Sequence, residues 1–428
     1  MESQSGEETK KTLKTKALQE KQWKIFRTSV RKAKLFAKEN SKEYCPDVLE
    51  YPASLPSKFI PLNIPNKPNN LQDKIIGLIL GQAVGDAIGL ATEFLNKETA
   101  LIYYPNREIH YDDYLLDRHR VKWMNENGVV ADWTDDTDQF LLILDDIVSH
   151  NGEVDVYDFA ARCVYWINFG FTEVGDIVPL GVGANFSKVV TSKGYVQDPL
   201  KNSEEVWISS GCKSAANGCV MRTSILGLPY FWDEKKVIEN ATKICQATHF
   251  DPRCVSCSIV TSLIIAQIIS GEEDISKIID HSLSEGIKVL EREEDINDFN
   301  TYFNKDITIE DMGLNKSIGY VFKPVSCAIY ALRRAEKELK ENKKEKTQIF
   351  KDIIIDFTME AGDADTNCAV IGSILGCYLG KDCVPEEWLK FDNYNWLLDR
   401  INRILKLFGE NQLEIQKSSI FNFLNFFN

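Results

Sequence analysis

The 428-residue sequence predicts an all-α fold, and two observations support this prediction. First, long segments carry apolar residues at intervals of three and four, the spacing that places them on one face of a helix. Second, runs that alternate apolar and polar residues, as half-buried strands do, are scarce. The helical segments are best seen at Leu141, Leu144, Ile147 and Val148, at Ile259, Leu263, Ile264 and Ile268, and at Ile371, Ile374, Leu375 and Leu379.

Composition divides the chain into successive parts. Residues 1–45 hold twelve Lys and Arg against six Asp and Glu, and we expect a basic, helical or partly disordered extension. Residues 46–72 are rich in Pro and Asn and predict a linker arm. A helical body follows over residues 73–382, with an acidic surface insertion at about 291–311, and residues 383–428 are expected to form a C-terminal helical tail.

Charge and cysteine content narrow the class of protein. The formal net charge of -14 argues against nucleic acid and anionic membranes as partners. Eleven cysteines, an odd number, and a start without a secretory signal predict an intracellular, cytoplasmic protein, with the nucleus left open. We also expect a monomer. The Cys254–Cys257 pair favours buried helix-face cysteines over a zinc site, since no second pair accompanies it. No apolar run reaches the roughly 20 residues that span a bilayer.

The first candidate site is the segment Trp133–Asp138, which directly precedes an apolar helical segment. Thr134 is suited to cap that helix, and aspartates in a first turn interact well with the helix dipole. Capping alone explains most such residues. However, Asp135, Asp136 and Asp138 are more acids than capping needs, and clustered carboxylates repel one another unless a cation lies among them. Oxygen ligands of this kind favour Mg²⁺ or Ca²⁺ over zinc.

The second candidate site is Glu360–Asn367, with Asp363, Asp365 and Thr366 before a helix of small residues. Glycines at four-residue spacing in that helix permit close contact with another helix. Taken alone, this acid pair is also consistent with a cap. If the two acidic segments face each other, their oxygens can hold a pair of hard cations.

Four further segments are weak predictors when each is considered alone. Glycines between Gly77 and Gly89, followed by Glu93, often have only a packing reason. The Gly181–Gly183 loop offers backbone N–H groups to phosphate but is commonly an ordinary turn. The same holds for the turn at Asn217–Gly218. A single histidine such as His249 is more often structural than functional.

In chain order, these motifs resemble the ADP-ribosylglycohydrolase family over about residues 73–382. The resemblance implies a catalytic domain that is a compact, all-α orthogonal bundle binding two Mg²⁺ ions. The implied metal ligands are Thr134, Asp135, Asp136, Asp363, Asp365 and Thr366. Glu93 would lie beside the substrate, and the implied ADP-ribose cleft is lined by Gly181, Gly183, Asn217, Gly218 and His249. The sequence departs from the family pattern at Ala361 and Ala364, which replace a glycine and a threonine.

We therefore expect a Mg²⁺-dependent hydrolase that cuts the glycosidic bond at the ribose anomeric carbon. It would remove ADP-ribose from a modified protein or a small molecule, with Glu93, Asp136 and Asp365 as the catalytic residues. Three alternatives stay open: a non-catalytic ADP-ribose-binding protein on the same fold, a Mg²⁺-dependent phosphohydrolase, and an interaction scaffold that uses the basic extension.

Overall fold

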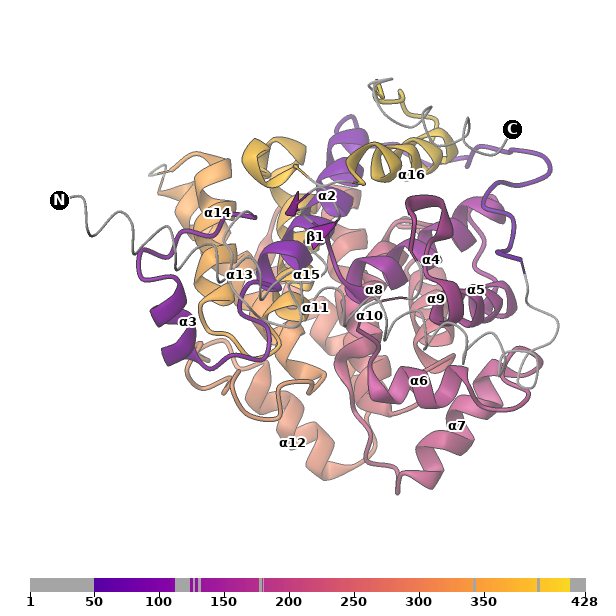
Figure 1. Ribbon diagram of the computed structural model, residues 1–428, viewed down its shortest axis with the longest axis horizontal. Coiled ribbons are helices and arrows are strands. Elements are labelled where there is room, and N and C mark those ends of the chain that lie inside the picture. The colour runs from indigo at the N-terminus through magenta and orange to yellow at the C-terminus, as the bar shows by residue number, and fades with distance from the viewer. Residues whose placement is uncertain are drawn as a thin grey trace, which may run out of the picture.

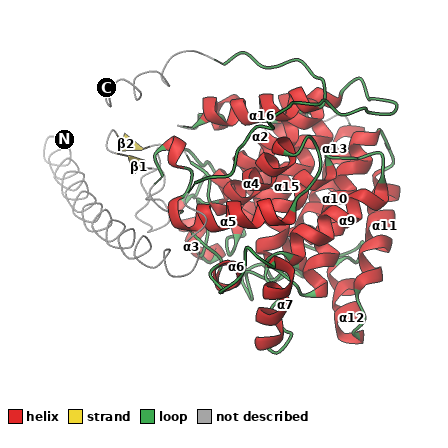
Figure 2. Cartoon of the chain, turned by 90° about the vertical axis from the view of Figure 1, so that its right-hand side faces the viewer, coloured by secondary structure: helices red, strands yellow, loops and turns green. Residues whose placement is uncertain are grey.

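The computed structural model describes residues 50–111, 124–125, 128–129, 132–176, 179, 181–341, 344–390 and 393–415. The predicted basic extension, residues 1–45, and the aromatic end of the chain lie outside the described residues. The structure is built almost entirely of helices (Figures 1 and 2), so the all-α prediction is confirmed. The exception is a short antiparallel pair, β1 (Met124–Asn125) and β2 (Gly128–Val129).

The α-helices are α2 (Leu71–Gly89), α3 (Lys97–Tyr103), α4 (Asp135–Ser149), α5 (Val156–Phe169), α6 (Ala184–Val190), α7 (Pro199–Ser209), α8 (Val220–Thr223), α9 (Glu234–Gln246), α10 (Pro252–Ser270), α11 (Ile275–Gly286), α12 (Glu293–Tyr302), α13 (Phe322–Lys340), α14 (Lys346–Thr358), α15 (Ala364–Leu379) and α16 (Tyr394–Leu407). Short 3₁₀ turns join several of them: η2 (Thr172–Val174), η3 (Asn217–Cys219), η4 (Ser224–Gly227), η5 (Ile287–Val289), η6 (Lys381–Cys383) and η7 (Glu386–Trp388).

Helices α2 and α15 lie against each other with their backbones in contact. Glycines recur every four residues on α2, and residues at this spacing form one stripe along a helix. A Cβ atom built at Gly81 would lie 2.0 Å from the carbonyl oxygen of Gly372, and one at Gly85 would lie 2.0 Å from that of Cys368. The two helices are antiparallel, since Gly77 meets Gly376 while Gly89 meets Ala364. The end of α2 therefore lies beside the start of α15.

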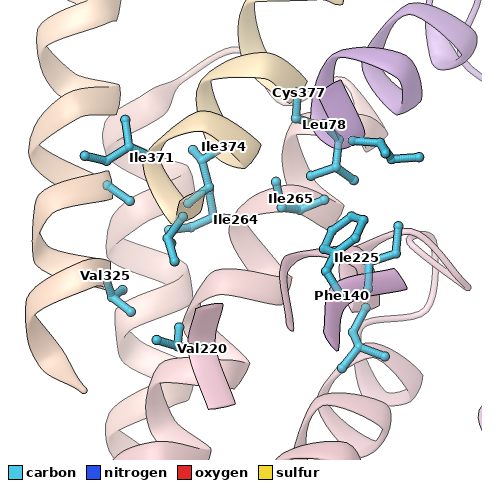
Figure 3. Close-up of a cluster of buried hydrophobic side chains, with 14 of the residues drawn as sticks. Leu78, Phe140, Val220, Ile225, Ile264, Ile265, Val325, Ile371, Ile374 and Cys377 are labelled. Atoms are coloured by element: carbon cyan, nitrogen blue, oxygen red, sulfur yellow. The ribbon is translucent and has the colours of Figure 1, made fainter. Parts of the chain in front are cut away.

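The hydrophobic core surrounds this helix pair. Figure 3 shows side chains from several helices gathered in one cluster, among them Leu78 (α2), Phe140 (α4), Ile264 (α10), Val325 (α13) and Ile374 (α15). All five are fully buried. Burial of one such side chain stabilises the fold by about 1.5–3 kcal/mol. The core thus fixes α4 and α15, the two helices that follow the acidic motifs, relative to each other.

Helix α10 is long and apolar enough to cross a membrane by length and composition, but 83% of its most apolar window is buried inside the protein. It is a core helix. Cys254 and Cys257 lie on it, and both are fully buried. Among the described residues, no group of side chains spaced to hold a metal ion contains a cysteine. This arrangement fits buried helix-face cysteines.

The Pro- and Asn-rich arm contains no helix or strand over residues 50–70, and it contacts the helical body along its length. The Leu62 amide donates to the carbonyl of Leu407 at 2.9 Å, and Lys67 donates to the carbonyl of Phe408 at 2.8 Å. Nearer the start of the arm, the carbonyl of Ala53 accepts a hydrogen bond of 2.8 Å from Arg162 on α5. The arm is therefore held against α5 and the end of α16.

The acidic segment at about 291–311 contains a helix, α12, where the sequence showed no sustained apolar period. Phe299 and Phe303 are buried, and their rings pack edge-to-face against Phe322 at the start of α13. Two aromatic residues four positions apart thus attach an otherwise acidic helix to the body.

Candidate active site

Asp86 positions the first turn of α4. Its carboxylate is fully buried and accepts hydrogen bonds from four donors, the backbone amides and hydroxyls of two threonines. The Thr134 amide and hydroxyl lie 3.0 and 2.8 Å from Oδ1, and the Thr137 amide and hydroxyl lie 2.9 and 2.7 Å from Oδ2. Thr134 is also the N-cap of α4, as the sequence predicted. Asp86 thereby fixes α4 against α2.

Asp136 has one carboxylate oxygen without a protein partner. Its Oδ2 accepts a hydrogen bond of 3.1 Å from Thr134, but its buried Oδ1 has no hydrogen-bond partner among the described residues. Carboxylate oxygens of Asp86, Asp136 and Asp365 all lie within 4.8 Å of one another. A buried, unpartnered carboxylate oxygen is unfavourable. A cation between the three acids would satisfy it.

A second group of acids shares Asp365 with the first. Oxygens of Glu93, Asp363 and Asp365 also lie within 4.8 Å of one another. Backbone pairing holds this group together, because Phe94 donates to the carbonyl of Gly362 at 2.6 Å and Gly362 donates to that of Leu95. Asp363 occupies the N-cap position of α15, yet its side chain makes no capping hydrogen bond. Capping therefore does not account for this acid.

The two predicted acidic motifs thus meet in one place. Thr366 also lies there, and its hydrogen bond with Asp136 lowers the pKa of that carboxyl. Asp135 lies at the edge, outside both three-acid groups, and its Oδ2 accepts a 3.3 Å hydrogen bond from Gln139. Asp138 faces away from the cluster and accepts hydrogen bonds from the indoles of Trp133 and Trp166, at 2.8 and 3.1 Å.

Of the residues expected to line the cleft, Gly181 and Asn217 lie beside acids of this region. A Cβ built at Gly181 would lie 2.9 Å from Oδ1 of Asp135, and one at Gly183, the N-cap of α6, would meet no atom of the described residues within 4 Å. On the other side, Asn217 donates to Oδ2 of Asp363 at 2.7 Å. His249 places Nε2 3.2 Å from a Cβ built at Gly218.

Sequence reasoning missed four residues of this region: Asp86, Gln139, Arg222 and Thr248. For Asp86 a signal existed, since it is the one acid within the apolar run Ile75–Leu90, and a buried charge requires partners. The other three are linked to one another through side-chain hydrogen bonds between α4, α8 and the segment before His249. No local pattern identifies such contacts.

Burial and mutual repulsion act together on the acids of the cluster. Burial raises the pKa of Asp136 and Asp365 well above the usual aspartate range, and repulsion from the neighbouring carboxylates raises it further. Burial together with Asp363 and Asp135 raises the pKa of Glu93 to about 9. Without a cation, Glu93 therefore holds a proton at neutral pH. Perturbed carboxylates of this kind concentrate at functional sites.

The Glu93 pKa leads to a prediction for the metal-free protein. The ordinary pKa is 4.5, so between about pH 4.5 and pH 9 the folded state retains a proton that the unfolded chain has released. The free energy of unfolding therefore falls as the pH rises through this window. In EDTA, calorimetry is expected to show a steeper fall of Tm for wild type than for Glu93→Gln. Equal slopes would contradict the prediction.

The departures at positions 361 and 364 leave the site geometry in place. Ala361 has a φ of +61°, a left-handed conformation that glycine adopts without strain and that strains an alanine by about 1–2 kcal/mol. Ala364 is fully buried, and its carbonyl oxygen lies 2.4 Å from a Cβ built at Gly89 in the seam between α2 and α15. The first departure therefore affects stability, and the second suits the tight helix contact.

Comparison with known proteins assigns the class. A sequence model described as ADP-ribosylglycohydrolase matches residues 67–414. An ADP-ribosylarginine hydrolase Tri1 from Serratia proteamaculans is 22% identical over 321 residues, 74% of each chain. The ADP-ribosyl-[dinitrogen reductase] glycohydrolase of Rhodospirillum rubrum is 23% identical over 321 residues, 75% of this chain and 90% of its own. A solved ADP-ribosylglycohydrolase-related protein shares the fold, with a TM-score of 0.52 at 18% identity over 80% of this chain and all of its own.

The fold and the site therefore define a hydrolase of glycosidic bonds. The chain belongs to the ADP-ribosylglycohydrolase family, and the predicted family and fold type are confirmed. The match extends past residue 382 and includes α16.

Proposed function

We propose that this enzyme releases ADP-ribose from a modified protein or small molecule by Mg²⁺-dependent cleavage at the ribose anomeric carbon. The observation that carries the proposal is the pair of three-acid groups that share Asp365. The relatives' names support the kind of substrate, since one is an ADP-ribosylarginine hydrolase and another acts on ADP-ribosyl-[dinitrogen reductase].

The residues fit a divalent cation. Every donor in the cluster is an oxygen, which suits Mg²⁺ or Ca²⁺. The unpartnered Oδ1 of Asp136 provides a free ligand atom. Two overlapping groups favour two ions, with Asp365 facing both. The residues proposed to hold them are Thr134, Asp135, Asp136, Asp363, Asp365 and Thr366, and we include Asp86 because its carboxylate belongs to the first group.

The chemistry follows from charge. Cleavage of the bond at the anomeric carbon develops positive charge on the ribose ring, and nearby carboxylates stabilise it. Bound Mg²⁺ would supply orientation of the ribose hydroxyls and help a water molecule lose its proton. Glu93, Asp136 or Asp365 would accept that proton. Glu93 lies on the segment paired with Gly362, so it also suits orientation of the scissile bond.

The test is a panel of defined substrates incubated with the full chain and Mg²⁺: ADP-ribosyl-arginine and ADP-ribosyl-serine peptides, poly-ADP-ribose and O-acetyl-ADP-ribose. Release of free ADP-ribose from at least one, abolished by EDTA and restored by Mg²⁺, is the expected result. Activity that persists in EDTA would overturn the metal dependence.

The same panel separates the alternatives. A non-catalytic ADP-ribose-binding protein would bind ADP-ribose in calorimetry and release no product. A phosphohydrolase would release inorganic phosphate and leave the glycosidic bond intact. Either result would overturn the proposed function.

A further inference from the structure

Arg222 on α8 is a fully buried cation in unusual surroundings. Its guanidinium donates to two neutral oxygens, Oε1 of Gln139 and Oγ1 of Thr248. It also lies over the rings of Phe159 and Phe186, at 5.2 and 5.5 Å from their centroids. Within the described part of the chain, no carboxylate forms an ion pair with it, although buried arginines are seldom found unpaired. Its place calls for an explanation other than a salt bridge.

The first consequence concerns Gln139. An arginine side chain has donors and no acceptor, so the amide oxygen of Gln139 must face it. The amide nitrogen must then face the other way, where it donates to Oδ2 of Asp135 at 3.3 Å. Arg222 therefore fixes which end of the Gln139 amide reaches Asp135. A flipped amide would present an oxygen to that carboxylate and repel it.

The second consequence concerns His249. The Thr248 hydroxyl accepts from Arg222, and its own proton can go to Nδ1 of His249, 2.8 Å away. Burial lowers the pKa of His249 to about 4, so the ring is neutral at physiological pH. A neutral ring that accepts at Nδ1 carries its proton on Nε2. That N–H lies against Gly218, whose neighbour Asn217 donates to Asp363.

We propose that Arg222 is a positioning residue that sets the proton arrangement on both sides of the site. Through Gln139 it orients Asp135, and through Thr248 it holds His249 as the Nε2–H tautomer, which offers an N–H donor beside the Asn217–Gly218 turn. The donor is suited to an anionic or hydroxyl oxygen of the bound ADP-ribose. The substrate half of this inference rests on the proposed function, whereas the proton arrangement does not.

The experiment compares Arg222→Met and Arg222→Lys with a matched control, Arg162→Lys. Arg162 is also fully buried, but it donates to Asp158 and to backbone carbonyls of the arm. Nitrogen NMR of ¹⁵N-histidine-labelled protein, assigned with His249→Asn, reports the tautomer of His249. Calorimetry with Mg²⁺ alone reports the metal affinity. Kinetics on the substrate found by the panel report kcat and KM.

We expect the Nε2–H tautomer in wild type and in Arg162→Lys, and a mixture of tautomers in Arg222→Met. Mg²⁺ affinity is expected to fall about 10- to 100-fold in both Arg222 variants, the usual effect of removing an outer-shell partner of a metal ligand. Arg222→Lys keeps the charge but lacks the fork that reaches both acceptors, so charge alone should not restore the wild-type values. The KM should rise more than kcat falls.

Two results would count against the inference: a wild-type His249 protonated on Nδ1, or Arg222 variants with the tautomer and Mg²⁺ affinity of Arg162→Lys. A wild type that releases no ADP-ribose, together with a tautomer that depends on Arg222, would overturn the proposed function and leave the proton arrangement standing.

Discussion

Replacement of Asp365 by asparagine is expected to lower ADP-ribose release by about a thousandfold or more, because metal assistance contributes several kcal/mol to such reactions. Asp365 belongs to both three-acid groups, so the change should also abolish detectable Mg²⁺ binding in calorimetry. The metal-free variant should nevertheless melt at a higher temperature than wild type. Burial and four neighbouring acids already raise the pKa of Asp365, and a neutral amide removes that repulsion.

The matched control is Asp138→Asn, the same substitution in the first turn of α4. Asp138 accepts from two buried indoles, and an amide nitrogen turned toward either indole would leave a donor unpaired. Such a loss destabilises a protein by about 1–3 kcal/mol. We expect this variant to be less stable and to keep its Mg²⁺ affinity. If Asp365→Asn retained Mg²⁺ binding and turnover, the assignment of the acids to the cation would be wrong.

These opposite expectations show what sequence could and could not predict. Both acidic motifs are recognisable because they contain more carboxylates than a helix start needs. The extra carboxylates therefore require a function other than capping, such as binding a cation. Asp86 is as important for the geometry, yet its neighbours are glycines and aliphatic residues, and the threonines that donate to it lie about 50 positions away. Such a role depends on how close α2 and α4 lie in space, and the spacing of residues along the sequence does not show this.

The fold shows the same division. Apolar periodicity was sufficient for the core helices, because a repeat of three and four is a property of each segment by itself. It failed for α12, where Phe299, Phe303 and Tyr302 pack on the aromatic residues at the start of α13 but the rest of the segment is rich in acids and Asn. Arg222 is a further case, since one of its two acceptors belongs to α4 and the other to the turn after α9, and the arginine itself follows an Asn-Gly turn.

Gly85→Ala is expected to have the largest effect on stability, and its sign is opposite to the one that helix propensity predicts. In an ordinary helix, alanine in place of glycine stabilises by about 1 kcal/mol. Here the new Cβ would lie 2.0 Å from the carbonyl oxygen of Cys368, while ordinary contact begins near 3.4 Å. The backbones of α2 and α15 would have to separate by more than an ångström. Overpacking of this kind destabilises by about 1–3 kcal/mol, or more where backbone must move.

The same displacement would reach the acids, because Asp86 follows Gly85 directly and Asp365 begins the facing helix. A misplacement of about 1 Å can lower catalysis about a hundredfold. We therefore expect Gly85→Ala to lose Mg²⁺ affinity and turnover even where guanidinium titration shows the protein still folded. Gly183→Ala is the control for stability, since its φ is -58° and a Cβ there meets no described residue within 4 Å. Its free energy of unfolding should stay within about 0.5 kcal/mol of wild type. A stabilised Gly85→Ala variant would mean that propensity prevails over contact in this seam, and that α2 and α15 do not set the distance between Asp86 and Asp365.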